Sequence, residues 1–178
     1  MTALPTRRDE AFRYADIEAL ASVWRDLTAP ETLQIAAQQK LQQIWLPSGE
    51  DIEVRRAQIT LEAGAVYSLF ALNTAQEYGR VELDITLHEG AVFNFNAANI
   101  GAGKTTLEIV TTVRHQEPSA TSRQVIRSVL NGSAVGSYLG KVAVARDAQQ
   151  SDGEQSVKAM LLDRGATANC KPDRKSVV

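Results

Sequence analysis

The sequence predicts an all-β fold, a right-handed parallel β-helix (β-solenoid) with a short helical segment at its N-terminus. Three observations support this prediction: an internal repeat with a period of 26 residues, alternation of apolar and polar residues within each repeat, and Gly-Ala corners between the alternating runs. Repeats of this length, built from short strands and tight turns, are typical of solenoids whose coils stack on one another.

The repeat is clearest in two segments. Residues 59–73 read ITLEAGAVYSLFALN and residues 85–99 read ITLHEGAVFNFNAAN, with eight of the fifteen positions identical. Alternation with period two sends successive side chains to opposite faces of a strand. We therefore expect the apolar residues that open each repeat to point inward and stack in register, Ile59 on Ile85 and Leu61 on Leu87.

The corners and the ends of the repeats carry recurring residues. Gly64 and Gly90 supply the backbone freedom that a tight corner between strands requires. Asn73 and Asn99 recur at the same phase of the repeat, which predicts a ladder of stacked side chains.

Residues 31–46 admit two interpretations. They are rich in Ala, Gln, Leu and Lys, which favours a helix on propensity alone. However, Leu33 lies one period before Ile59 and opens a third, more divergent repeat. Propensity is a weak guide against tertiary context, so we expect strands here.

After residue 100 the period loosens while the alternation of apolar residues continues. Small residues between the alternating runs predict further corners at 131–133, 151–153 and 164–166. The alternating positions are Leu107, Ile109, Thr111 and Val113; Val125, Arg127 and Val129; Val142 and Val144; and Val157, Ala159 and Leu161.

The first thirty residues have a helical pattern. Thr6 and Asp9 have the spacing of a capping box, and Pro30 closes the segment. One or two short helices are expected over residues 8–27, with Ile17, Leu20, Trp24 and Leu27 on one face. The predicted organisation is an N-terminal helical segment over 1–30, a parallel β-helix over 31–172 and a short polar tail over 173–178.

Composition argues against several classes of protein. The net charge of −2 comes from interspersed signs, whereas a nucleic-acid surface needs clustered Lys and Arg. No apolar run approaches the ~20 residues of a membrane span, and the N-terminus lacks the apolar core of a secretory signal. The single cysteine, Cys170, suits a reducing compartment, so a cytoplasmic location is expected.

Residues 101–106, GAGKTT, partly match a phosphate-binding loop. The loop requires glycine at the position that Ala98 occupies, and a helix after the lysine. The residues after Lys104 are β-branched and alternate, which predicts a strand. We therefore expect a corner with a solvated Lys104 and no nucleotide site.

Metal ligands are too few for a zinc site. Such sites use three or four ligands at compatible spacing, and one cysteine, Cys170, with two scattered histidines, His88 and His115, falls short of that. We expect structural or surface histidines and an exposed thiol, and therefore no metal-binding or cofactor-binding residues. A contact of Cys170 with a cluster or a persulfide is the less favoured alternative.

The acidic residues Asp147, Asp152 and Glu154 raise the possibility of a β-helical carbohydrate-active enzyme, a lyase or hydrolase in which carboxylates flank a sugar. They are predicted to lie in a loop beside Arg146 and Lys158. No Gly-x-Ser-x-Gly nucleophile elbow is present. We expect no catalytic residues and no enzymatic activity, with this enzyme class and a plain interaction solenoid as the alternatives.

Two stretches resemble the SufB/SufD family of iron–sulfur cluster assembly proteins. Residues 4–17, LPTRRDEAFRYADI, resemble the LPTRxDExWRYTDL segment of SufD-like proteins, and residues 113–172 are similar to the family's long signature. The matching positions of that signature are His115, Pro118 and Ser122; Arg127, Leu130 and Gly132; Gly140, Lys141 and Val142; and Asp152, Gly153 and Gln155.

The resemblance implies a non-enzymatic scaffold or partner subunit that pairs with a SufB-like subunit and works with the SufC ATPase. An iron–sulfur cluster would be held by the intact complex. The chain ends in DRKSVV where the family continues with an Asp-Asp-x-x-x-Cys-Ser-His-Gly segment and a helical domain, so it resembles a SufD branch member truncated at its C-terminus. No cluster ligand is carried over, and the exposed terminal coil predicts a homodimer.

Overall fold

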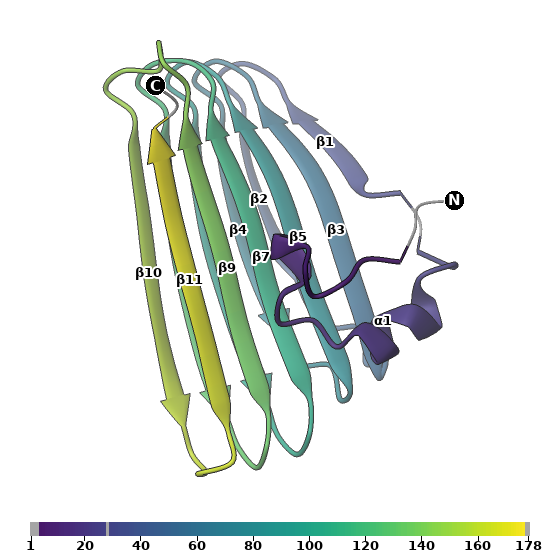
Figure 1. Cartoon of the computed structure of the whole chain (residues 1–178). Helices are drawn as coiled ribbons and strands as arrows, with labels where there is room; N and C mark the ends of the chain where they lie inside the picture. The colour runs from purple at the N-terminus through teal and green to yellow at the C-terminus, as the bar shows by residue number, and fades with distance from the viewer. Residues whose placement is uncertain (1–3, 28, 177–178) are drawn as a thin grey trace.

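The computed structural model describes residues 4–27 and 29–176 and consists almost wholly of strands (Figure 1). A 3₁₀-helix η1 (Glu10–Phe12) and a helix α1 (Ile17–Val23) come first. The strands follow: β1 (Glu31–Ile35), β2 (Lys40–Trp45), β3 (Ile52–Leu61), β4 (Val66–Asn73), β5 (Tyr78–Leu87), β6 (Val92–Gly101), β7 (Thr106–His115), β8 (Thr121–Leu130), β9 (Val135–Val144), β10 (Asp152–Leu161) and β11 (Thr167–Ser176).

The strands form two parallel sheets because odd-numbered and even-numbered strands alternate between two walls. Sheet A has the order β1-β3-β5-β7-β9-β11, and sheet B has the order β10-β8-β6-β4-β2. The chain winds from one sheet to the other and returns one strand further along, as Figure 1 shows. The predicted parallel β-helix is confirmed, and the strand interpretation of residues 31–46 is correct.

The repeat has the predicted register. Ile59 pairs with Ile85 and Leu61 with Leu87, and all four side chains are buried. The corners that follow are closed by glycines in the left-handed region, with φ of 65° at Gly64 and 64° at Gly90. Side chains other than glycine rarely adopt this conformation.

The apolar core lies between the two sheets. Tyr67 on β4 stacks on Phe93 on β6 with 6.0 Å between ring centroids, and Phe95 continues the row. All three rings are fully buried. Burying a large apolar side chain contributes about 1.5–3 kcal/mol, so this row is a main source of stability.

Coil length grows along the chain because β4 has eight residues whereas every strand from β5 onward has ten, and because some later corners are longer. The paired Asn73 and Asn99 are 26 residues apart, whereas the paired Ser137 and Asn169 are 32 apart. The corners predicted at 131–133 and 164–166 are present. The corner predicted at 151–153 is wrong in part, because Asp152 and Gly153 already pair with β8.

The N-terminal segment packs on the outer face of sheet A. Asp16 caps α1, its Oδ1 accepting from the N–H groups of Glu18 and Ala19 at 3.1 Å. Leu20 is buried beneath the helix against β3 and β5. The predicted Thr6–Asp9 contact exists, with the Thr6 N–H donating to Asp9 Oδ2 at 2.8 Å. It closes a turn before η1 and does not start α1.

Candidate functional site

A buried polar cluster lies between sheet A and the N-terminal segment. Arg80 on β5 and Glu108 on β7 are register partners, and their outward-pointing side chains meet at 3.1 Å between Nη1 and Oε2. The hydroxyl of Tyr78 donates to the same Glu108 oxygen at 2.5 Å. Glu82 accepts from Arg80 Nε at 3.0 Å. Arg80 is 1% exposed and Glu108 0%, so both are removed from water.

The cluster fastens residues 4–16, which we call the N-terminal strap. Arg80 Nη2 donates to the carbonyl of Ala11 at 2.9 Å, and the Phe12 ring lies 4.2 Å from the guanidinium. At the other side of the sheet, Lys171 on β11 pairs with Glu10 at 2.5 Å. The strap therefore crosses the outer face from β5 to the last strand.

Burial determines the electrostatics of the cluster. It raises the pKa of the Glu108 carboxyl above its usual value, although Arg80 and Tyr78 act in the opposite direction. It also raises the pKa of Tyr78, with the Glu108 charge adding to the effect. For Arg80, burial lowers the pKa, but Glu108 and Glu82 outweigh it and the net direction is upward. The group remains a cation whose donors are used by Glu108, Glu82 and the Ala11 carbonyl.

Strongly perturbed buried charges are often catalytic, but the contacts of these side chains indicate a structural role. They hold the N-terminal strap on sheet A. The polar atoms of Tyr78, Arg80 and Glu108 are directed at one another and at the strap, and only Glu108 Oε1 has no hydrogen-bond partner. Removing one partner of such a pair leaves an uncompensated buried charge. The cluster thus fixes the strap on the solenoid.

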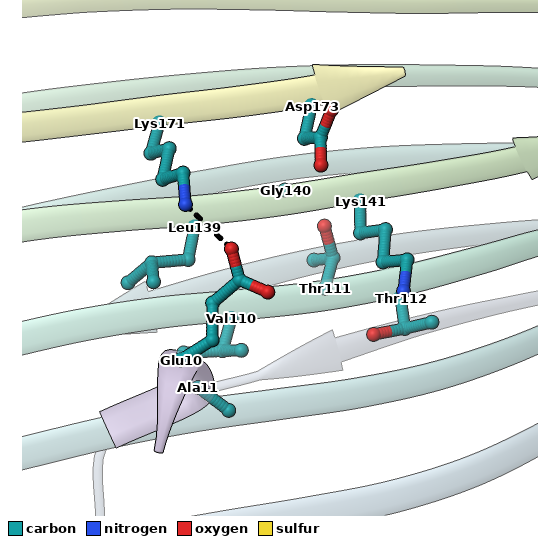
Figure 2. A pocket seen from close by; sticks show the side chains of 10 residues that line it. All are labelled: Glu10, Ala11, Val110, Thr111, Thr112, Leu139, Gly140, Lys141, Lys171 and Asp173. Carbon is teal, nitrogen blue, oxygen red and sulfur yellow. Dashed lines mark hydrogen bonds and ion pairs between the residues drawn. The ribbon is translucent and has the colours of Figure 1, made fainter. Parts of the chain in front are cut away.

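A small cavity lies beside the strap, between η1 and strands β7, β9 and β11 (Figure 2). Ala11, Val110 and Leu139 form its apolar part, while Lys141 and the Lys171–Glu10 pair lie at its polar side. Its volume is about 80 Å³. Sites for small molecules usually have about 300–1,000 Å³, so the cavity is too small for a cofactor.

A second set of polar residues lies inside the solenoid and includes positions of the family signature. His115 is buried, with Nε2 2.9 Å from Ser122 Oγ and Nδ1 3.2 Å from the Ala120 carbonyl. A Cβ at Gly153 would lie 3.4 Å from that Ser122 oxygen and 3.0 Å from Val142. The signature residues His115 and Ser122 of one coil and Val142 and Gly153 of the next are therefore one packing unit across two coils.

Interior polar residues also pack around Tyr138 on β9. The hydroxyl of Tyr138 donates to Gln155 Oε1 at 2.9 Å and lies 3.2 Å from Gln124 Oε1. Gly140, two residues after Tyr138, leaves the space that this hydroxyl and Gln155 fill. Near the start of the solenoid, Asn73 Nδ2 donates to Asn99 Oδ1 at 3.0 Å, so the predicted asparagine ladder is present and buried.

The residues that were considered as metal ligands lie far apart in the structure. His88 lies on a corner with Nδ1 3.2 Å from Glu117, while His115 is inside the solenoid. Cys170 is on β11 with an exposed side chain, and its partial burial raises the pKa of the thiol. Across residues 4–27 and 29–176, no group of three or more His, Cys, Asp or Glu could hold a metal ion.

The other candidates are equally separate. Lys104 is exposed on the turn before β7, and the strand that follows lacks the helix of a phosphate-binding loop. Asp147 lies in a corner, while Asp152 and Glu154 lie on β10, where Glu154 pairs with Arg123 at 3.4 Å. In the described part of the chain, no helix is long and apolar enough to cross a membrane.

Sequence reasoning missed Arg80, Glu108 and Tyr78. All three occupy outward positions of strands, where charged and polar residues are ordinarily solvated. Their burial comes from the strap, which lies about seventy residues earlier in the sequence. The available signal was a Tyr-x-Arg-x-Glu run at 78–82 facing a lone glutamate on the next strand.

These features define a parallel β-solenoid whose interior polar residues pack one coil on the next. The chain belongs to the SufBD family: residues 32–176 match the family model of the SUF system FeS cluster assembly, SufBD core domain. It is also 25% identical over 127 residues to an iron–sulfur cluster assembly SufBD family protein of Synechocystis. That match covers 71% of this chain and 28% of the relative. No solved structure matches the chain.

Proposed function

We propose that the chain is a non-enzymatic scaffold or partner subunit in iron–sulfur cluster assembly, of the SufD branch and located in the cytoplasm. The match of the SufBD core domain to almost the whole solenoid carries this proposal. The second support is structural: the polar residues inside the solenoid are engaged in packing contacts, as the His115–Ser122 and Tyr138–Gln155 hydrogen bonds illustrate. The carbohydrate-active alternative has no comparable support.

The partners in this proposal are a SufB-like subunit and the SufC-like ATPase. The surface proposed for the SufB-like subunit is the coil of β10 and β11, which end sheets B and A among the described residues. Each has one edge whose amide and carbonyl groups face away from its sheet, and such edges pair readily with another chain. Without the SufB-like subunit, the same edges support a homodimer.

Iron and sulfide are cargo in this proposal. A cluster generally needs several thiolates, and the only cysteine of the chain is Cys170. The remaining ligands would come from the SufB-like subunit, and this chain would supply the surface on which that subunit is held.

The test is co-expression with SufB-like and SufC-like subunits, followed by affinity capture and reconstitution with iron and sulfide. Capture of both subunits, with a cluster that needs the SufB-like subunit, is the expected result. The variant Ala159→Pro should abolish capture, because the Ala159 N–H points to the open edge of β10 and its loss removes no bond to β8. Lys158→Ala is the control on the same strand. Failure to capture either subunit would contradict the proposal.

A further inference from the structure

A second cavity lies beside the strap, at the start of strands β7, β9 and β11. Its volume is about 290 Å³. The strap contributes Arg7, Arg13, Tyr14 and Asp16 to its lining, and the first residue of each of the three strands lies on the side of the sheet. Sites for small molecules usually have about 300–1,000 Å³. This cavity is at the lower end of that range, so it suits a small ligand and not a nucleoside triphosphate.

The strap residues that line this cavity are motif residues. Arg7, Arg13, Tyr14 and Asp16 all coincide with fixed positions of the LPTRxDExWRYTDL segment that residues 4–17 resemble. Arg8, the third arginine of the strap, falls on a variable position of that segment and lies outside the cavity lining. The contacts between the strap and sheet A described above use neither Arg7 nor Arg13, so they do not explain why both arginines line one cavity.

Both guanidinium groups keep donors available for a ligand. Arg7 Nε donates to the carbonyl of Ala15 at 3.3 Å, which fixes the side chain along the strap. Across residues 4–27 and 29–176, no side chain or carbonyl accepts a hydrogen bond from the Nη groups of Arg7 or from any nitrogen of Arg13. The Asp16 carboxylate in the lining is engaged by α1, since its Oδ1 accepts from the N–H groups of Glu18 and Ala19. Two like charges that share a cavity repel each other, and a bound anion would replace this repulsion by attraction.

The sheet adds uncharged donors from the opposite side of the cavity. Thr106 on β7 and Thr167 on β11 lie in one row, because both are register partners of Val135 on β9. Asn169 lies two residues further along β11, where its Nδ2 also donates to Ser137 Oγ at 3.2 Å. Hydroxyl and amide groups of this kind can donate to an anion. The cavity therefore has charged donors on the strap and neutral donors on the sheet.

The number of donors indicates the class of anion. A carboxylate has two oxygens with about four acceptor positions, and the free nitrogens of Arg7 and Arg13 alone would occupy them. A phosphate group has at least three strongly accepting oxygens, which can also reach Thr106 and Thr167. Arginine binds phosphate through two parallel N–H groups, as its planar fork allows.

We propose that this cavity binds the phosphate group of a small ligand, either inorganic phosphate or a short phosphate monoester. Arg7 and Arg13 bind its oxygens from the strap, and Thr106 and Thr167 bind them from sheet A. The bound phosphate thereby joins the strap to β7 and β11. This inference goes beyond the proposed function, because it concerns a ligand of this chain alone.

Titration calorimetry at constant ionic strength tests the class of ligand. Inorganic phosphate and ribose 5-phosphate are the two phosphate probes, and acetate is the carboxylate probe. At least one phosphate probe should bind with a dissociation constant below about 1 mM, and acetate should bind at least about tenfold more weakly. Tighter binding of ribose 5-phosphate would identify a monoester site, whereas tighter binding of inorganic phosphate would identify a site for the free anion.

Substitutions test the residues. Arg13→Ala should weaken phosphate binding at least about tenfold, as expected for the loss of hydrogen bonds from a charged donor. Its urea midpoint should stay unchanged, because the Arg13 guanidinium binds no other described residue. Thr167→Val should weaken binding about threefold or more by removing one neutral donor. Arg8→Ala is the control on the strap, and Thr112→Val is the control on the same face of β7 outside this cavity; both should bind phosphate as the unaltered chain does.

Timed trypsin cleavage gives a second readout. Saturating phosphate should slow cleavage of the strap in the unaltered chain, because the ligand joins the strap to the sheet. The same concentration should not slow cleavage after Arg7 and Arg8 in Arg13→Ala. A protein that binds phosphate only as a diffuse counterion would show no such protection.

Three results would overturn the proposal. The first is the absence of saturable binding of either phosphate probe up to about ten millimolar. The second is binding of acetate as tight as that of phosphate, which would indicate a carboxylate ligand. The third is equal weakening in Arg8→Ala and Arg13→Ala. All three experiments use the chain without its proposed partners, so this inference can fail while capture of the SufB-like and SufC-like subunits succeeds, and the reverse.

Discussion

Arg80 Nη2 donates to the backbone carbonyl of Ala11 at 2.9 Å, and this bond joins residues 69 positions apart in the sequence. The same guanidinium binds Glu108 and lies under the Phe12 ring. One side chain therefore links the strap, β5 and β7. Its removal should affect the strap and the solenoid together.

Arg80→Ala should lower the free energy of unfolding by about 3–5 kcal/mol, since it leaves the Glu108 carboxylate buried without its partner. It should also release the strap, and trypsin should then cut after Arg7, Arg8 or Arg13 at least tenfold faster. Urea denaturation and timed proteolysis are the measurements. Arg114→Ala is the control, because Arg114 forms an exposed pair with Asp84 on the same face, and such pairs contribute about 1 kcal/mol or less. Equal effects of the two substitutions would show that Arg80 does not hold the strap on sheet A.

The second prediction concerns pH. Burial raises the pKa of Glu108 in the folded chain, whereas the unfolded chain has the ordinary value near 4.3. Between these two values the folded state binds more protons, so the contribution of Glu108 to the unfolding free energy increases as the pH falls toward the ordinary value. Glu108→Gln should remove this increase. The measurement is the urea midpoint of both proteins at pH 7 and pH 5; the same pH dependence in both would show that Glu108 ionises normally.

Gly140→Ala should destabilise the chain by about 1–3 kcal/mol, because the new methyl group would meet the Tyr138 hydroxyl and Gln155 inside a packed coil. Tyr138→Phe removes that hydroxyl and should recover part of the loss when the two substitutions are combined. Thermal denaturation of the two single variants and the double variant measures this coupling. Strictly additive effects would mean that the alanine is accommodated elsewhere.

Lys104 should not bind nucleotide. It lies on an exposed turn, and the strand β7 that follows offers no helix N-terminus to a phosphate. Titration calorimetry with ATP and magnesium should show no saturable heat. Micromolar binding that disappears in Lys104→Ala would reverse this expectation.

The chain alone should not retain an iron–sulfur cluster. A monomer offers one thiolate, and burial raises the pKa of that thiol, which lowers the thiolate fraction at neutral pH. Reconstitution with iron and sulfide should give no visible absorbance after desalting. A chromophore that survives desalting and vanishes in Cys170→Ser would contradict the prediction.

The repeat made the β-solenoid predictable because pairing in a parallel coil follows sequence spacing. One coil takes 26 residues here, so Ile59 and Ile85, which are 26 residues apart, become register partners. Even residues 31–46, with helical propensity, follow the register of the coil. Helix propensity differs by less than ~1 kcal/mol per residue, and strand pairing with the next coil outweighs it.

Orientation and distant contacts were harder to predict. In β8, alternation indicated a strand, but the apolar Val125 and Val129 point outward while the polar Ser122 and Gln124 point inward. Hydrogen bonds to His115 and Tyr138 stabilise those polar residues, and these partners lie on β7 and β9 of the opposite sheet. The burial of Arg80 and Glu108 likewise depends on the strap. The periodicity of the sequence indicates neither the inward orientation of Ser122 and Gln124 nor the burial of Arg80 and Glu108.

The constant strand length has a consequence for how this chain can change. From β5 onward every strand has ten residues, so the extra residues of longer coils lie in the corners. One residue added within a strand would turn every later side chain of that strand to the opposite face. Residues added near 146–150, in the corner between β9 and β10, would leave inward and outward side chains of both sheets as they are. The corners are therefore the positions at which this protein can accept an insertion, such as a peptide tag or a foreign loop, while keeping its core.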